Sequence, residues 1–303
     1  MSEPSSVLPA SNLPELDLHC PTTLDDAFTG LANGAHPLAG GTDVLLWASQ
    51  RGGPRQLVWT GAIPELQTIE ANVDNFRVGA AVPIARLVRS SSFRTAAPAV
   101  TEGAQSIGSV QIRNQATLMG NVCTASPAGD TLPGLLVHDG IVEIASGDGS
   151  RRQVKLVDFL IGPGQTGLKA GELCIAISLT PLAAGEISFY KRFTERNALD
   201  LAFASVAARL KFEPDGVTVN AARLALGAVG PVVIDASEAA AILIGKPLTV
   251  QAMQKCAGGA AEICAPITDH RASADYRRQL IKVLVADVIT ETGLRANSVT
   301  EQT

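Results

Sequence analysis

The sequence predicts an α+β fold in two consecutive parts, the second of which holds a three-stranded antiparallel sheet and a helical bundle. Three observations predict it: short apolar runs punctuated by Gly and Pro as far as Pro181, a change to small residues over 181–185, and helical periodicity near the C-terminus. The chain has 303 residues, 46% of them hydrophobic, which suffices for a sizeable core. We place the domain boundary after residue 183, which gives domains 1–183 and 184–303.

In the first part, short strands alternate with helices, as expected for layered folds of strands and helices. Residues 1–20 are rich in Pro and Ser and are predicted to form an irregular lead-in. The stretch 106–130 shows no clear periodicity and is predicted to be a long functional loop with packed apolar residues. The predicted strands are 36–39, 57–60, 67–70, 76–79, 141–145 and 152–156, the last two forming a hairpin, and the predicted helices are 43–50, 98–105 and 132–138.

In the second part, three strands precede three helices. A turn at Glu213-Pro214-Asp215-Gly216 separates the second strand from the third. In the last helix, apolar residues recur at i, i+4 spacing and form one stripe, for example Leu280, Leu284 and Val288. The predicted strands are 187–193, 201–212 and 217–225, and the predicted helices are 237–244, 250–264 and 273–292.

Composition excludes several classes of function. The net charge of −5 and the aromatic content of 4% argue against a nucleic-acid-binding protein, and no apolar run reaches the roughly 20 residues that span a membrane. The first basic residue is Arg51, so we expect no secretory signal and a cytoplasmic protein. The five cysteines include no C-x-x-C pair and the four histidines are scattered, which predicts neither a disulfide framework nor a metal or iron–sulfur site.

A first candidate segment joins a predicted strand to a predicted helix through Gly40 and Gly41. Such a junction exposes backbone N–H groups at the positive end of a helix, and the missing Cβ atoms let a phosphate approach closely. Thr42 can add a hydroxyl donor. The alternative is an ordinary turn in which Thr42 caps the helix. The G-x-G-x-x-G and Walker A patterns are absent, which argues against Rossmann and P-loop sites.

Two further segments carry polar groups suited to a cofactor. In 113–133, Thr and Asn side chains close to a glycine can donate to a pyrophosphate or a flavin edge, and Asp130 can accept from a ribityl or ribose hydroxyl. In 190–202, Lys191 can stabilise negative charge on a flavin. For each group the alternative is ordinary loop chemistry or, for Lys191 and Arg196, a solvated strand end.

Taken together and in this order, the segments resemble the medium, FAD-binding subunit of the molybdenum hydroxylases, the xanthine dehydrogenase and carbon monoxide dehydrogenase family. Its flavin domain is of the PCMH type, and a C-terminal domain of the CO dehydrogenase flavoprotein type follows. The resemblance extends over about residues 9–292. Its Ala-Gly-Gly-x-Ser/Thr loop is matched by Ala39 to Thr42, with Asp43 following them. Its Arg-Asn-x-Gly-Thr-Ile-Gly-Gly-Asn and Ser-Pro-x-x-Asp motifs are matched by 113–121 and 126–130, and its Phe-x-Lys and Asp-x-Ala motifs by Phe189, Lys191, Asp200 and Ala202.

The resemblance implies a non-covalently bound FAD and assigns neither a catalytic nor a metal-binding residue to this chain. Ala116 and Met119 depart from the pattern, because glycine is common at both positions. Each adds a Cβ, and a positive φ at either would strain the loop. The implied FAD contacts come from Leu38, Ala39, Gly40, Gly41, Thr42, Asp43, Ile107, Ala116, Thr117, Gly120, Asn121, Asp130, Ile175 and Lys191.

The resemblance also implies a heterotrimeric oxidoreductase. A small subunit with 2Fe–2S clusters would pass electrons from a large molybdopterin subunit to the FAD, which would pass them to an external acceptor. One alternative is a stand-alone flavoprotein oxidoreductase of the same fold, which would need its own acid or base over the flavin ring. Another is a flavin-free scaffold subunit, to which Ala116 and Met119 point.

Overall fold

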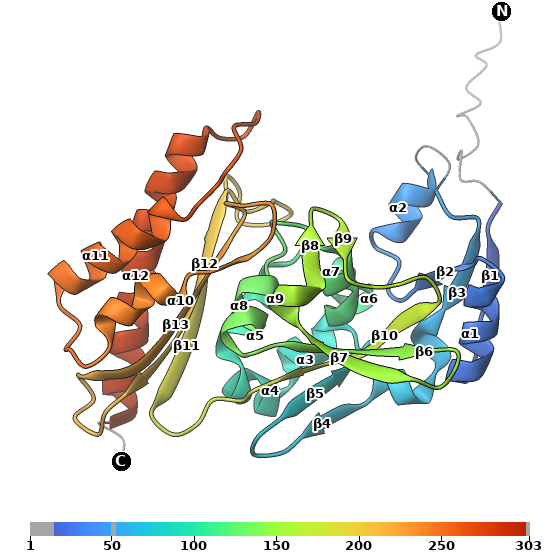
Figure 1. The fold of residues 1–303 in the computed structure, drawn as a ribbon, viewed down its shortest axis with the longest axis horizontal. Coiled ribbons are helices and arrows are strands. Elements are labelled where there is room, and N and C mark those ends of the chain that lie inside the picture. The colour runs from blue at the N-terminus through green and yellow to red at the C-terminus, as the bar shows by residue number, and fades with distance from the viewer. Residues whose placement is uncertain (1–14, 50–52, 301–303) are drawn as a thin grey trace, which may run out of the picture.

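The computed structural model describes residues 15–49 and 53–300, so most of the predicted irregular lead-in lies outside the described residues. Within them, that prediction is wrong, because β1 (Asp17–His19) pairs with a later strand. Figure 1 shows two parts side by side, with the elements up to β10 in one and those from β11 onward in the other. The mixture of helices and strands confirms the α+β class.

A three-stranded parallel sheet, in the order β1-β3-β2, opens the first part. Parallel neighbours need crossover connections, and two helices supply them. Thr23 begins the first of these helices, since its Oγ1 accepts from the amide of Asp26 at 3.2 Å. The other elements of this layer are α1 (Leu24–Ala32), β2 (His36–Leu38), α2 (Val44–Ser49) and β3 (Gln56–Trp59).

A five-stranded antiparallel sheet, in the order β4-β5-β10-β6-β7, forms the second layer. The central strand was not predicted. It is buried from Leu173 to Leu179, so it lacks the alternation of a half-buried strand. The predicted hairpin is confirmed by the pairing of β6 with β7. The strands are β4 (Ile69–Ala71), β5 (Phe76–Gly79), β6 (Ile141–Ser146), β7 (Arg151–Lys155) and β10 (Glu172–Leu179).

Short helices fill the chain between β5 and β6. The prediction of one long loop over 106–130 is wrong, because two helices of six and seven residues lie there. Helices this short make fewer than two turns, so they show no periodicity, although Ser109 and Thr117 cap their first turns. The helices are α3 (Ile84–Arg89), α4 (Ser91–Ala96), α5 (Pro98–Ser106), α6 (Val110–Gln115), α7 (Leu118–Thr124) and α8 (Leu132–Val137).

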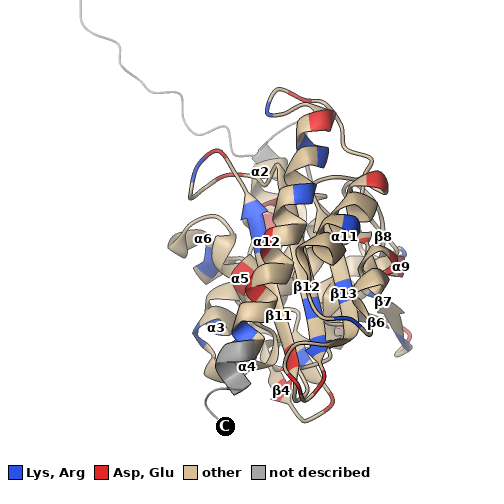
Figure 2. Cartoon of the chain, turned by 90° about the vertical axis from the view of Figure 1, so that its left-hand side faces the viewer, with Lys and Arg blue, Asp and Glu red and all other residues tan. Residues whose placement is uncertain are grey.

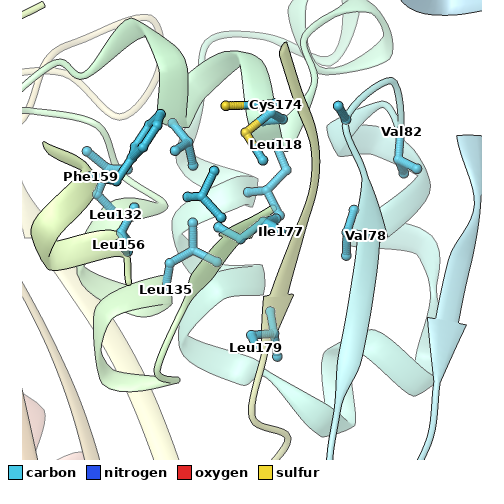
Figure 3. Close-up of a cluster of buried hydrophobic side chains, with 14 of the residues drawn as sticks. Val78, Val82, Leu118, Leu132, Leu135, Leu156, Phe159, Cys174, Ile177 and Leu179 are labelled. Atoms are coloured by element: carbon cyan, nitrogen blue, oxygen red, sulfur yellow. The ribbon is translucent and has the colours of Figure 1, made fainter. Parts of the chain in front are cut away.

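The core of the first part lies between the five-stranded sheet and these helices. Figure 3 shows side chains of β5 and β10 gathered with side chains of α7, α8 and α9 (Leu156–Phe159). Phe159 and Leu135 are fully buried there. The apolar residues of α7 are buried in this core. The opposite face of the helix is therefore free to carry polar residues. Short 3₁₀ helices and strands complete this part: η1 (Thr60–Ala62), η2 (Pro64–Gln67), β8 (Leu160–Gly162) and β9 (Gln165–Thr166).

The second part is an antiparallel sheet in the order β11-β12-β13-β14. It has four strands rather than the predicted three, because a two-residue strand too short to recognise in sequence pairs with the edge of β13. The helix predicted at 237–244 is a short α-helix followed by a 3₁₀ turn. The elements are β11 (Glu186–Phe193), β12 (Ala204–Phe212), β13 (Val219–Gly227), β14 (Ile234–Asp235), α10 (Ser237–Ala240), η3 (Ala241–Leu243), α11 (Val250–Glu262) and α12 (Ala274–Thr300).

Helices cover both faces of this second sheet. α11 and α12 lie on the outer face, and α5 and α8 of the first part lie on the inner face (Figure 1). Tyr190, Ala207 and Ala225 consequently belong to the core of the first part, although they lie in the second. The predicted boundary after residue 183 falls between β10 and β11, and the division into domains 1–183 and 184–303 stays a prediction.

A buried polar contact joins the two parts. His138, which follows α8, is fully buried, and its Nδ1 lies 2.9 Å from the carbonyl oxygen of Thr180. Its Nε2 lies 2.9 Å from the hydroxyl of Ser188 on β11, which also accepts from the amide of Ala99 at 3.1 Å. Because the carbonyl can only accept, Nδ1 carries the proton and Nε2 accepts from Ser188. Burial lowers the pKa of His138 to about 4, so the imidazole is neutral at pH 7.

Candidate functional site

One face of α7 carries the polar residues of the second candidate segment. Thr117, Gly120, Asn121 and Thr124 stand at i, i+3, i+4 and i+7, so they share one side of the helix. We call this set the α7 polar face. Leu118, Met119 and Val122 lie on the other side, buried in the core. The same short helix thus anchors itself in the core and presents a row of polar groups.

Thr117 begins this helix and shapes its first turn. Its backbone is extended, with φ −106° and ψ 155°, and its Oγ1 accepts from the amide of Gly120 at 2.9 Å. A Cβ on Gly120 would lie 2.9 Å from that oxygen, closer than carbon and oxygen allow. The absence of a side chain at Gly120 therefore leaves room for the Thr117 hydroxyl to approach the backbone of this turn.

The loop of the first candidate segment packs directly against the residues that precede α7. A Cβ on Gly40 would lie 2.0 Å from the carbonyl oxygen of Gln115 and 2.8 Å from the Cα of Ala116. Gly41 has φ +72°, a conformation that other residues rarely adopt. Gly40 is thus needed for close backbone packing between two segments more than 70 residues apart in sequence.

A side-chain hydrogen bond ties the same loop to the α7 polar face. The hydroxyl of Thr124 donates to Oδ2 of Asp43 at 2.8 Å. In the described part of the chain, the Thr42 hydroxyl makes no hydrogen bond, so the alternative of a turn capped by Thr42 does not describe this loop. Leu38 lies buried at the end of β2, and Ala39 to Asp43 are half-buried. Residues 38–43 therefore lie against α7 and against the residues that precede it.

Ala116 and Met119, which replace common glycines, are accommodated without strain. Ala116 has φ −59°, and Met119 lies within α7. Neither is among the positive-φ residues of the described chain. Ala116 packs with Ile84 and Ala104, and Ile107 packs against this small cluster. The extra Cβ atoms therefore point into packed regions rather than into the candidate site.

Asp130 and its neighbour connect the α7 polar face to the second part of the chain. The hydroxyl of Thr131 donates to Oδ1 of Asn121 at 2.6 Å. Asp130 is buried; its Oδ1 accepts from the Tyr190 hydroxyl and its Oδ2 from Nη1 of Arg192, each at 2.6 Å. Burial raises the pKa of the Asp130 carboxyl, and the Arg192 guanidinium opposes that rise.

Lys191 does not lie beside Asp130, Tyr190 and Arg192. Side chains alternate along β11, so Ser188, Tyr190 and Arg192 face the first part of the chain while Lys191 faces α12. There its Nζ donates to Oδ2 of Asp287 at 2.7 Å, and both side chains are nearly half exposed. Basic and acidic residues are interspersed along α12 (Figure 2). The cation that the structure places beside Asp130 is Arg192, one residue later.

The two isoleucines of the predicted site use their backbone carbonyl oxygens within the protein. Ile175 is buried in the central strand β10, where its carbonyl oxygen accepts from the amide of Ala80 at 2.9 Å. Ile107 is half-buried, and its carbonyl oxygen accepts from Nη1 of Arg113 at 2.7 Å. Their side chains are apolar and can offer a cofactor only packing contacts.

Three residues of this arrangement were missed in the sequence: Thr124, Tyr190 and Arg192. A signal for each was present. Thr124 continues the i, i+3, i+4, i+7 spacing from Thr117, but this spacing has meaning only in a helix, and the sequence predicts a loop there. Tyr190 and Arg192 share a face of a strand that was predicted, so alternation would have paired them and separated them from Lys191.

Other features of the described chain lie away from this site. A cavity of about 380 Å³ is lined by residues of α1, η2 and the β6–β7 hairpin, including the Glu65–Arg151 ion pair, and by none of the predicted site residues. Within 15–49 and 53–300, no group of three His, Cys, Asp or Glu residues is arranged to hold a metal ion. Among the same residues, no helix is long and apolar enough to cross a membrane.

Comparison with protein families places both parts of the chain. Residues 14–181 match the FAD-binding domain in molybdopterin dehydrogenase, and residues 188–292 match the CO dehydrogenase flavoprotein C-terminal domain. The xanthine dehydrogenase FAD-binding subunit of Escherichia coli O157:H7 is 31% identical over 278 residues, which cover 90% of this chain and 94% of that protein. The carbon monoxide dehydrogenase medium chain of Hydrogenophaga pseudoflava is 29% identical over 276 residues, with coverage of 90% and 95%.

Solved structures show the same architecture. A carbon monoxide dehydrogenase from Hydrogenophaga pseudoflava that lacks the Mo-pyranopterin moiety matches with a TM-score of 0.88 and 28% identity, over 93% of this chain and 98% of that chain. Quinoline 2-oxidoreductase from Pseudomonas putida 86 matches with a TM-score of 0.88 and 27% identity, over 94% of this chain and 99% of that chain. The likeness thus extends through both parts.

Proposed function

Because the chain belongs to the family of FAD-binding subunits of molybdopterin dehydrogenases, we propose that it is the FAD-binding, electron-transfer subunit of a multi-subunit molybdenum hydroxylase. FAD is its cofactor, and the complex is an oxidoreductase. Its partners are a small subunit with 2Fe–2S clusters and a large molybdopterin subunit. Electrons pass from the small subunit through this chain to an external acceptor.

The observation that carries the proposal is the α7 polar face with the loop 38–43 packed against it and against the residues that precede it. Gly40 allows the first loop to lie against the residues before α7, and Thr124 holds that loop through Asp43. Backbone and hydroxyl donors at such a junction suit a pyrophosphate. Asp130, held by Arg192, suits the hydroxyl groups of the ribityl chain. The residues present therefore fit an FAD.

The residues of this chain bind and orient the cofactor. Bound FAD supplies the redox chemistry that no side chain here provides, since it exchanges electrons both singly and in pairs. The loop containing Gly40 and Gly41 holds the phosphates together with Thr117 and Gly120. Arg192 pairs with Asp130 and keeps the Asp130 carboxylate available as an acceptor. The contact of Lys191 with the flavin stays a prediction. The flavin contacts of Leu38, Ala39, Thr42, Ile107, Ala116, Asn121 and Ile175 are proposed as backbone or packing contacts around this frame.

Structural observations weaken both alternatives. A flavin-free scaffold was suggested by Ala116 and Met119, yet both fit without a positive φ. A stand-alone oxidoreductase needs an acid or base over the flavin, but His138 is buried in the contact between the two parts and His36 lies on the strand β2 before the loop. Substrate chemistry is therefore assigned to a partner subunit.

The test is a visible absorption spectrum of the chain purified alone, followed by acid release of any chromophore. We expect two flavin bands and FAD in the acid supernatant. Co-expression with the neighbouring subunits should then yield a complex in which the flavin is reduced when the substrate of the molybdenum subunit is added. A colourless chain that takes up no added FAD would contradict the cofactor assignment.

A further inference from the structure

A buried tyrosine donates a hydrogen bond to one oxygen of the Asp130 carboxylate. Tyr190 is 4% exposed, and its hydroxyl donates to Oδ1 of Asp130 at 2.6 Å. The two residues are 60 positions apart and belong to different parts of the chain. Burial and the neighbouring carboxylate raise the pKa of the Tyr190 phenol well above its usual value. The phenol therefore stays neutral and remains a donor throughout the physiological pH range.

We propose that Tyr190 is a positioning residue of the FAD site, because its hydroxyl holds the Asp130 carboxylate ionised and oriented as a hydrogen-bond acceptor for the cofactor. The inference rests on the proposed function. Nothing in the family motifs of this sequence selects Tyr190, which occupies the variable position of Phe-x-Lys. Tyr190 is identified by the register of β11, which points its side chain into the core of the first part of the chain.

The chemistry follows from the number of donors at each carboxylate oxygen. Arg192 occupies Oδ2, and Tyr190 supplies a separate donor at Oδ1. A buried carboxylate oxygen that loses its donor carries a large desolvation cost, so the pKa of the acid rises further. A protonated Asp130 would offer an O–H donor where the site needs an acceptor. Tyr190 thus affects binding through the protonation of its neighbour.

Other charged groups near Asp130 do not replace this donor. On α5, Glu102 accepts from the backbone amide of Tyr190 at 2.8 Å and from Arg295 of α12. In the loop after β11, the carbonyl oxygen of Asp200 accepts from Arg192, and its carboxylate accepts from the amide of Arg196. Carboxylates and carbonyl oxygens cannot donate to Asp130. Among the described residues, only Tyr190 and Arg192 donate to its side chain.

The experiment is a titration of FAD into the deflavinated full-length chain from pH 5.5 to 8.5, for the wild type, Tyr190→Phe and Tyr276→Phe. The two tyrosines are the only ones in the chain, and Tyr276 is 45% exposed, so it provides a matched loss of a hydroxyl. At pH 7, Tyr190→Phe should bind FAD about tenfold more weakly, the scale of one hydrogen bond to a charged group. As the pH is lowered, the FAD affinity of Tyr190→Phe should fall further. This fall should begin at a higher pH than in the wild type and in Tyr276→Phe.

The outcomes separate the inference from the proposed function. A Tyr190→Phe curve identical or parallel to the wild-type curve would overturn the positioning role, since a merely structural loss leaves the pH profile unmoved. Failure of the wild type to bind FAD would instead overturn the proposed function. If Tyr190→Phe does not fold, Asp130→Asn decides: it should bind weakly and without pH dependence, and wild-type affinity in that variant would contradict the inference.

Discussion

At the scale of single residues, Gly40 shows how a glycine can serve a binding loop indirectly. Gly40→Ala would place a Cβ 2.0 Å from the carbonyl oxygen of Gln115, so one of the two backbone segments must move. We expect a loss of about 2 kcal/mol in the free energy of unfolding, or more, and at least tenfold weaker FAD binding. Urea denaturation and FAD titration measure the two effects.

A matched control for this change is available in α11. A Cβ on Gly258 meets no atom within 4 Å, so Gly258→Ala should stabilise the chain by up to about 1 kcal/mol through helix propensity. FAD affinity should stay at the wild-type value. Normal FAD binding by Gly40→Ala would show that the contact between Gly40 and the backbone of Gln115 and Ala116 is dispensable for the site.

Neighbouring cations on β11 should behave in opposite ways. Arg192→Ala leaves the buried Asp130 carboxylate without its cation and should cost about 3 kcal/mol of stability, together with FAD affinity. Lys191→Ala removes an exposed ion pair with Asp287 and should cost less than about 1 kcal/mol, with FAD affinity unchanged. Chemical denaturation and FAD titration of both variants test this. Loss of FAD affinity in Lys191→Ala but not in Arg192→Ala would support the predicted contact of Lys191 with the flavin.

At the scale of elements, α7 depends on its cap. Thr117→Ala removes the hydroxyl that accepts from the amide of Gly120 and should lower stability by about 1 kcal/mol. Because the cap shapes the turn beside the loop, FAD binding should weaken as well, and Thr117→Ser should retain both properties. Thermal unfolding and FAD titration provide the measurements.

Ser109 offers the corresponding control on a neighbouring helix. Its Oγ accepts from the amide of Ile112 at 3.3 Å and caps α6, which has no buried residue. Ser109→Ala should therefore disturb α6 locally and leave FAD binding unchanged. Equal losses of FAD affinity in both cap variants would mean that the α7 polar face has no special role.

The elements also mark how far sequence patterns could predict this fold. The strand 76–79 has the predicted bounds, and most other predicted strands agree within a few residues, because turn residues bound these apolar runs. β10 lacks the alternation of a half-buried strand and was not predicted, whereas β12, which is also buried along nearly all of its length, was. α6 and α7 could not be recognised either, because one or two turns do not establish a period.

At the scale of the whole molecule, the contact between the two parts should respond to pH through His138. Burial lowers the pKa of His138 to about 4 in the folded chain, whereas an unfolded histidine titrates near 6.5. Between these values the unfolded state binds more protons, so the free energy of unfolding falls as the pH drops from about 6.5 to about 4. The loss should approach about 3 kcal/mol.

Urea denaturation of the wild type and His138→Gln at pH 7.5, 5.5 and 4.5 tests this expectation. The variant should be less stable at pH 7.5 but should lose less stability on acidification, because glutamine does not titrate. His270→Gln changes an exposed histidine and should follow the wild-type pH dependence. Equal slopes for His138→Gln and the wild type would show that His138 is not the titrating group.

The sequence by itself determined the α+β class, the two-part organisation of sheets and helices, and the family with its cofactor, because these follow from local patterns and from motifs that survive as strings of residues. It also indicated both segments of the candidate site, 38–43 and 113–133, although the second forms helices rather than the predicted loop. What it could not determine are the partners of each side chain. Asp43 meets Thr124 and Asp130 meets Tyr190 only because the chain folds back over 81 and 60 residues.

The tertiary structure decided the rest for a physical reason. In a strand, a step of one residue turns a side chain to the opposite face, so the register of β11 determines that Arg192 faces Asp130 and Lys191 faces α12. Likewise, Gly40 is a glycine because another backbone passes beside it, a contact that no local motif encodes. Spacing within a segment is local information, whereas the charge beside a buried carboxylate depends on which distant elements pack together.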